Sequence, residues 1–190
     1  MKQYTTPVII GLVILLLTGC AGMKPTVFVH PEYNFGYVER VAIIPFENLS
    51  SDQGAAHRVT RLFMSELLAT EAFDVVEPGE VTRSMNNNSV LYPADITQDQ
   101  IIAMGKELGV QAFIIGTLNE STSIRSGGTA TSVVTLVVRM VETDSGQTVW
   151  SSTHTEGGRG FWSSLFGTGG KSTSEVTRNC VKRAIKTLVD

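Results

Sequence analysis

An almost uninterrupted apolar run near the start of the chain determines which residues belong to the folded part of the protein. The run extends from Val8 to Leu17, Gly11 is its only non-apolar member, and one cation, Lys2, precedes it. As a helix it would span about 15 Å, roughly half of the hydrocarbon core of a bilayer. A core helix would also show polar residues at helical spacing, and this run does not. The pattern therefore predicts a signal peptide.

The run ends in the tetrapeptide LTGC, which occupies residues 17–20. In order, spacing and position this tetrapeptide resembles the lipobox of bacterial lipoproteins. The resemblance implies cleavage between Gly19 and Cys20, loss of residues 1–19, and acylation of Cys20 with chains such as palmitate. Several acyl chains hold a protein on a bilayer far more firmly than one chain does. The covalent lipid is the only non-protein group that we expect.

The residue after the lipid cysteine bears on location. Ala21 follows Cys20, where an Asp would be the alternative. This resembles the outer-membrane sorting pattern of lipoproteins in enteric bacteria. We therefore expect an anchor in the outer membrane, with the protein facing the periplasm. An anchor in the inner membrane is the alternative that the sequence leaves open.

The charge of the mature chain bears on its binding partners, and its cysteine content bears on disulfide formation. Removing residues 1–19 takes away Lys2 alone among the charged residues, so 14 basic and 18 acidic side chains remain and the net charge is −4. The basic residues form no cluster of the kind that binds phosphate, so nucleic acid is not expected as a partner. Once Cys20 carries lipid, Cys180 has no cysteine left to pair with, and no disulfide is expected.

The mature chain is expected to form a tether and one domain. Residues 20–38 mix turn formers with scattered aromatic residues and predict a lipidated N-terminus and a tether that ends in contact with the domain. Residues 39–190 predict the domain itself. Within it, 40–46 and 112–118 are short, almost continuous apolar runs, which is typical of strands covered on both faces. The Ser-, Thr- and Gly-rich stretch 120–131 predicts a flexible connection.

Helical periodicity marks the remaining elements. It predicts a helix over 55–69, a brief helix after Pro78, a third from 97 to 108, and a closing helix after 172. Thr97 with Gln100 and Ser172 with Glu175 have the spacing of capping boxes. The segments 133–141 and 148–151 flank an Asp-Ser-Gly turn and predict a hairpin, with 133–141 as the longest strand. The predicted class is a single α/β (α+β) domain: a mixed β-sheet with helices packed on it, a C-terminal hairpin and a closing helix.

Four stretches together resemble a known family. They are RVAIIPFENLS, FDVVEPGEV, ELGVQAFIIGTL and VETDSGQTVWSS, and they lie between about residues 40 and 152. They are similar to the CsgG-like lipoproteins, which include the curli secretion-channel subunit and the LpoB-type activators of penicillin-binding proteins. The resemblance extends over roughly 40–190. Its most specific pieces, the VAIIPF strand and the T-x-S-G-x-x-x-W segment from Thr143 to Trp150, mark the fold and no catalytic site.

The resemblance implies a lipid-anchored, periplasm-facing accessory of assembly or secretion that acts through protein contacts and forms homo-oligomers. The main alternative is a regulator of peptidoglycan synthases of the LpoB type. A curli-type pore is more distant, because it needs four segments of alternating polarity and neither 120–131 nor 157–171 alternates. An LpoB-type activator has a long spacer after the lipid, whereas an 18-residue tether reaches about 60 Å at most.

Residues with catalytic or ligand chemistry are scattered. Residues 167–173 resemble the phosphate-binding loop G-x-x-x-x-G-K-[ST], but Leu165 stands where its first glycine is needed. The three histidines, His30, His57 and His154, lack ligand spacing and are predicted to be isolated surface residues. Cys180 falls on an apolar helical stripe and is predicted to be a small core residue. We expect no enzyme activity, no metal and no small-molecule substrate.

One segment carries an unusual concentration of large apolar residues. Phe161, Trp162, Leu165 and Phe166 lie within six residues, with glycines on both sides. Such a segment could contact a membrane or a partner pocket. It could equally fold back over the edge of the protein's own sheet, and the sequence leaves both interpretations open.

Overall fold

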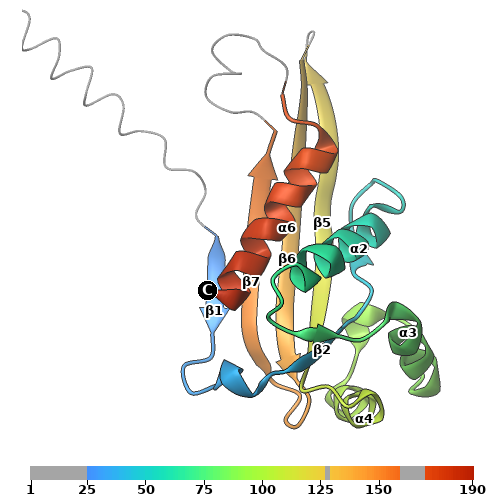
Figure 1. Cartoon of the computed structure of the whole chain (residues 1–190). Helices are drawn as coiled ribbons and strands as arrows, with labels where there is room; N and C mark the ends of the chain where they lie inside the picture. Colours follow the sequence, from blue (N-terminus) through green and yellow to red (C-terminus); the bar gives the residue numbers. More distant parts are fainter. Residues whose placement is uncertain (1–24, 127–128, 159–169) are drawn as a thin grey trace, which may run out of the picture.

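The computed structural model describes residues 25–126, 129–158 and 170–190, which form one domain of mixed α/β architecture (Figure 1). A seven-stranded mixed sheet carries the described helices, and the chain closes with a C-terminal helix. The predicted fold class is therefore confirmed. The signal peptide, Cys20 and the apolar segment 161–166 lie outside the described residues.

The sheet combines an antiparallel and a parallel part. Its strand order is β1 (Thr26–Val29), β7 (Thr148–Gly157), β6 (Thr129–Glu142), β5 (Ala112–Ser126), β2 (Arg40–Ile43) and β4 (Asp74–Val75), and β3 (Glu47–Asn48) pairs with β5 off this path. The pairs β1–β7, β7–β6 and β6–β5 are antiparallel, which includes the predicted hairpin. The pairs β5–β2, β2–β4 and β3–β5 are parallel.

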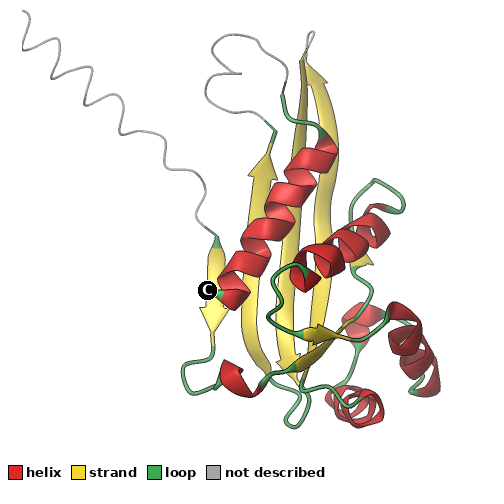
Figure 2. Cartoon of the chain, viewed as in Figure 1, coloured by secondary structure: helices red, strands yellow, loops and turns green. Residues whose placement is uncertain are grey.

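Helices cover both faces of the sheet, so the domain has three layers (Figure 2). One face carries α2 (Ala55–Leu68) and α6 (Thr173–Val189), and the other carries α3 (Pro78–Asn87) and α4 (Gln98–Leu108). Along β5, Ile114 packs into the core on the α2 and α6 side, while Phe113 and Ile115 pack into the core on the other side. Continuous apolar sequence therefore did indicate a strand that is buried on both faces.

The helix ends follow local sequence signals. The Thr97 and Gln100 side chains form the predicted capping box at the start of α4, and Gly109 ends that helix in the left-handed region at φ 62°. At α6 the Ser172 hydroxyl accepts a hydrogen bond from the Glu175 amide at 3.2 Å. The sequence that resembles a phosphate-binding loop thus supplies, through Ser172, the N-terminal cap of α6.

The prediction for the tether was wrong at residues 26–29. These residues form β1, whose register on β7 runs from Thr26 opposite Thr153 to Val29 opposite Trp150. The His30 amide continues this pairing by donating to the Val149 carbonyl at 2.8 Å. Branched and aromatic side chains favour such an edge strand, although nothing local shows which strand it will join. Five residues separate Cys20 from the start of β1.

The prediction of a flexible connection over 120–131 was also wrong. The β5–β6 ladder continues from Ser121 opposite Val134 to Ser126 opposite Thr129. At 15 residues β5 is longer than β6, which has 14 and was predicted to be the longest strand. The apolar signal fades because the described helices do not extend over this end of the sheet (Figure 1), so Ser and Thr can fill strand positions there.

Candidate interaction surfaces

Cys180 lies in the core and not at a reactive site. Its side chain, on α6, is fully buried against the sheet, and its thiol donates to the His154 carbonyl of β7 at 3.4 Å. Burial raises the pKa of the Cys180 thiol to about 12, and the Glu156 carboxylate adds to this. The thiolate is the nucleophilic form of cysteine, so this thiol is unreactive at neutral pH. Cys180 belongs to the buried core cluster, and the prediction of a small core residue is confirmed.

His154 is buried beneath α6, which corrects its prediction as a surface residue. Its side chain is 3% exposed, and its Nε2 has no hydrogen-bond partner among the described residues. Position 154 faces α6 because it lies on the same side of β7 as Trp150. Desolvation lowers the pKa of His154, and the nearby Arg183 guanidinium, which pairs with Glu156 at 2.8 Å, lowers it further. The imidazole is therefore held neutral in the folded protein.

Buried His154 gives a prediction on acid stability. The unfolded chain takes up a proton near pH 6.5 and the folded chain only at lower pH, so the free energy of unfolding should fall as the pH drops below 6.5. One proton limits this slope to about 1.4 kcal/mol per pH unit. Urea unfolding between pH 7.5 and 5 should show a steeper loss in the wild type than in His154→Leu. Equal slopes would contradict this account of the histidine.

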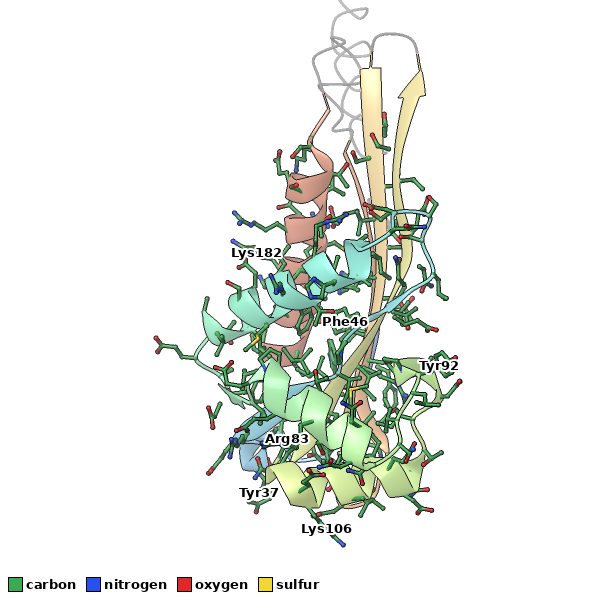
Figure 3. The ribbon with its side chains drawn as sticks, turned by 90° about the vertical axis from the view of Figure 1, so that its right-hand side faces the viewer. Tyr37, Phe46, Arg83, Tyr92, Lys106 and Lys182 are labelled. Atoms are coloured by element: carbon green, nitrogen blue, oxygen red, sulfur yellow. The ribbon has the colours of Figure 1, made fainter. Side chains whose placement is uncertain are left out.

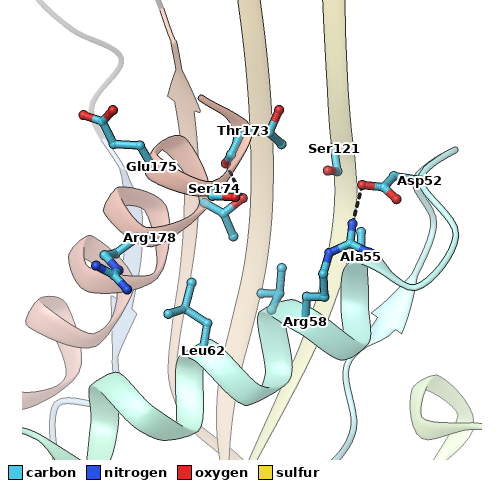
Figure 4. Close-up of a pocket in the computed structure, with 11 residues that line it drawn as sticks. Asp52, Ala55, Arg58, Leu62, Ser121, Thr173, Ser174, Glu175 and Arg178 are labelled. Carbon is cyan, nitrogen blue, oxygen red and sulfur yellow. Dashed lines mark hydrogen bonds and ion pairs between the residues drawn. The ribbon is translucent and has the colours of Figure 1, made fainter. Parts of the chain in front are cut away.

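A polar hollow of about 560 Å³ opens between α2, α6 and β5 (Figure 4). Its lining combines charged, hydroxyl and small apolar side chains: Asp52, Ala55, Arg58, Val59, Leu62, Ser121, Thr173, Ser174, Glu175, Thr177 and Arg178. The charges already have partners, since Arg58 pairs with Asp52 at 2.6 Å and Arg178 pairs with Glu66 at 3.4 Å. No histidine or cysteine lines this hollow. Its hydroxyl and charged side chains offer hydrogen-bond donors and acceptors to a ligand.

Two further features, a metal-binding cluster and a membrane-spanning helix, are absent from the described residues. In ranges 25–126, 129–158 and 170–190, no group of three or more His, Cys, Asp or Glu side chains is arranged to hold a metal ion. Within the same ranges, no helix combines the length and the apolar character needed to cross a bilayer.

The most exposed apolar surface near the predicted anchor is β1. Val27, Phe28 and Val29 are 39%, 44% and 51% exposed, although strand residues of this type are normally covered. Because His30 bonds to β7 and antiparallel bonding alternates, the backbone N–H and C=O groups of Val27 and Val29 point away from the sheet. Unpaired backbone groups with apolar side chains form a template for adding another strand. We call residues 26–29 the β1 edge.

The sequence contained a signal for this surface that was overlooked. The sequence from Thr26 to Val29 is TVFV, and Pro25 directly precedes it. A run of β-branched and aromatic residues that is bounded by proline is typical of a short strand. The pairing partner, β7, lies far along the chain, so no local pattern could identify it. The polar hollow has no comparable signal, because its lining comes from three separate elements.

Comparisons with known proteins show similarity at the level of the fold. No protein-family model matches the chain, and no curated protein sequence matches it. The solved structure of a PelC dodecamer from Paraburkholderia phytofirmans superposes with a TM-score of 0.60 at 14% identity, covering 88% of this chain and 100% of that one. Lipoprotein GNA1162 from Neisseria meningitidis superposes with a TM-score of 0.58 at 16% identity, covering 79% and 97%.

The LpoB-type proteins named by the sequence resemblance are more distant in structure. The LpoB C-terminal domain from Salmonella enterica superposes with a TM-score of 0.48 at 14% identity, covering 76% of this chain and 92% of that one. The resemblance to the curli subunit stays a prediction. This chain thus shares its fold with PelC and with the lipoprotein GNA1162.

Proposed function

We propose that this protein is a lipid-anchored component of the bacterial envelope that faces the periplasm and works without catalysis, through contacts with copies of itself and with other envelope proteins. The observation that carries the proposal is the β1 edge, an exposed apolar strand that begins six residues after Cys20. The anchor holds this edge at a membrane. Copies confined to the same membrane surface meet at a high effective concentration.

The fold similarities support the proposal without determining it. One similar structure is a lipoprotein, and another assembles as a dodecamer. Head-to-tail contacts close into a ring when their rotation allows it. The β1 edge is one margin of the sheet and β4, at Asp74–Val75, is the other, so the domain has two different edges for a head-to-tail contact.

The carbonyl and amide pattern of β1 allows a selective test. Val29→Pro removes an outward N–H while leaving the bonds to β7 intact, and proline is tolerated on edge strands when its nitrogen faces outward. We expect Val29→Pro to weaken self-association about tenfold or more, because a lost hydrogen bond and a steric block act together. Light scattering of the detergent-solubilised protein after gel filtration measures the assembly.

The matched control is Val29→Ala, which shortens the same side chain and keeps the N–H. It should assemble much more strongly than Val29→Pro. A monomeric wild type, or assembly that Val29→Pro leaves unchanged, would remove the β1 edge from the proposal.

The apolar residues Phe161, Trp162, Leu165 and Phe166 stay a prediction with both interpretations open: contact with a membrane or a partner, or packing over the edge of the protein's own sheet. The described residues on either side of them do lie together, since the Lys171 amide donates to the Gly158 carbonyl at 2.8 Å. Gly158 and Lys171 thus lie next to each other beside β6, where the Gly158 amide donates to the Ser132 carbonyl at 2.6 Å.

A further inference from the structure

The described helices leave part of one face of the sheet uncovered. Figure 3 shows the long strands edge-on, with α2 and α6 on one side and none of the described helices against the other side of their upper half. On that other side, α3 and α4 cover Phe113, Ile115 and Val141, which lie toward the lower end of the strands. Farther along β6 on the same face, Val133 and Val137 are half-buried and belong to neither core cluster.

Strand alternation and register decide which side chains lie on this uncovered surface. Leu136 of β6 packs into the core on the α2 and α6 side, so its odd-numbered neighbours on β6 point to the other face. Glu120 on β5 is opposite Thr135, and Ser151 on β7 is opposite Arg139, so both join the same face. We call this surface the open face and define it by six half-buried residues: Glu120, Val133, Thr135, Val137, Arg139 and Ser151.

Arg139 is the cation of the open face, and it has no carboxylate partner within the chain. All 18 Asp and Glu residues lie in the described ranges, and none of the ion pairs there involves Arg139. Its Nη1 donates one long hydrogen bond, to the Thr148 hydroxyl at 3.5 Å. Desolvation lowers the pKa of Arg139. The guanidinium has therefore lost part of its hydration, and a carboxylate from outside the chain would compensate for this loss.

Glu120 is the carboxylate of the open face. In the part of the chain that the structure describes, it forms no ion pair, and its Oε1 and Oε2 accept long hydrogen bonds from the hydroxyls of Thr122 at 3.3 Å and Thr135 at 3.4 Å. Arg139 lies four residues beyond Thr135 on β6, about 13 Å at 3.3 Å per residue. The open face thus carries one charge of each sign, too far apart to pair with each other.

We propose that the open face binds the open face of a second copy of this chain about a two-fold axis. An axis that lies in the interface and crosses the strands near Val137, midway between the two charges, places Arg139 of each copy over Glu120 of the other. Sheets that pack face to face lie about 10 Å apart, a gap that two long side chains can bridge. Val133 and Val137 supply apolar surface between the charges.

The charge pattern favours a second copy over an unrelated partner. In a two-fold contact the same surface occurs on both sides, so it must be complementary to itself. The open face meets this condition, because it contains both members of the ion pair, Glu120 and Arg139. The contact is separate from the β1 edge and does not require acylation of Cys20.

Exchanging the two charges within one chain tests the contact. Arg139→Glu brings like charges together at both ends of the two-fold interface, so we expect the dissociation constant of the dimer to rise about tenfold or more. Glu120→Arg should weaken the dimer in the same way. The double variant, Arg139→Glu with Glu120→Arg, restores opposite charges and should recover most of the affinity. Light scattering of the detergent-solubilised full-length protein over a dilution series measures the dimer.

Two controls separate this contact from other effects. Arg61→Glu makes the same change of net charge at an exposed position on α2 and should leave the dimer unchanged. Val29→Pro blocks the β1 edge alone and should reduce assembly no further than to the dimer. Urea unfolding first shows which variants are folded.

The outcomes distinguish the open face from the β1 edge. Dimers that persist in folded Arg139→Glu and Glu120→Arg proteins would overturn the open-face contact and leave the β1 edge untouched. Dimers that both single variants lose and a folded double variant does not recover would also overturn it, because the surface would then not be complementary to itself. A wild type that is monomeric throughout the dilution series would overturn both contacts.

Discussion

Cys20→Ser is expected to move the protein from the membrane fraction to the soluble periplasmic fraction of cells. Serine cannot form the thioether that carries the lipid, and each buried methylene contributes about 0.8 kcal/mol to membrane attachment. Losing several acyl chains should thus shift the distribution by many orders of magnitude, since every 1.4 kcal/mol is a factor of ten. Fractionation of cells that express each variant, followed by immunoblotting, measures the change.

The folded domain provides the control for this variant. The described residues begin at Pro25 and contain a buried core of their own, so the periplasmic Cys20→Ser protein should be folded and as resistant to proteolysis as the wild type. Membrane retention of a folded Cys20→Ser protein would show that something other than the lipid holds it.

Trp150→Ala should have the largest effect on stability. Trp150 is 1% exposed, and its Nε1 donates to the Thr187 carbonyl at 2.9 Å, so the ring joins β7 to the last turn of α6. Removing a buried tryptophan costs about 3–5 kcal/mol, a large part of the 5–15 kcal/mol that stabilises a typical domain. Urea unfolding followed by circular dichroism should show a correspondingly lower midpoint.

Trp150→Phe separates the contribution of the buried ring to stability from that of its hydrogen bond. It keeps most of the buried surface and loses the donor to Thr187, so its cost should lie near the 1–3 kcal/mol of one unsatisfied polar group. A loss of less than about 1 kcal/mol in Trp150→Ala would contradict the role of this side chain in holding α6 on the sheet.

The buried elements were predictable because their sequence signals are local. The run before Pro45 and the run that contains Phe113 and Ile115 are apolar on both faces, and they form the central strands β2 and β5. Thr97 and Gly109 mark both ends of α4 through capping chemistry that acts within one turn.

The surface elements were harder to predict, because their structure depends on distant partners. Strand β1 was assigned to a tether because it pairs only with β7, near the other end of the chain. The outer part of the β5–β6 hairpin has too few apolar residues for a periodic pattern. His154 was assigned to the surface because sequence does not show that α6 packs over its face of β7. The β1 edge, the main candidate surface, was missed for the same reason.

The N-terminal peptide of the native protein, purified from cell membranes and identified by mass spectrometry, tests the central claim most directly. We expect a peptide that begins at Cys20 and carries the mass of covalently attached acyl chains. A native protein that retains residues 1–19, or that begins at Cys20 without added lipid mass, would contradict both the proposed location and the proposed role.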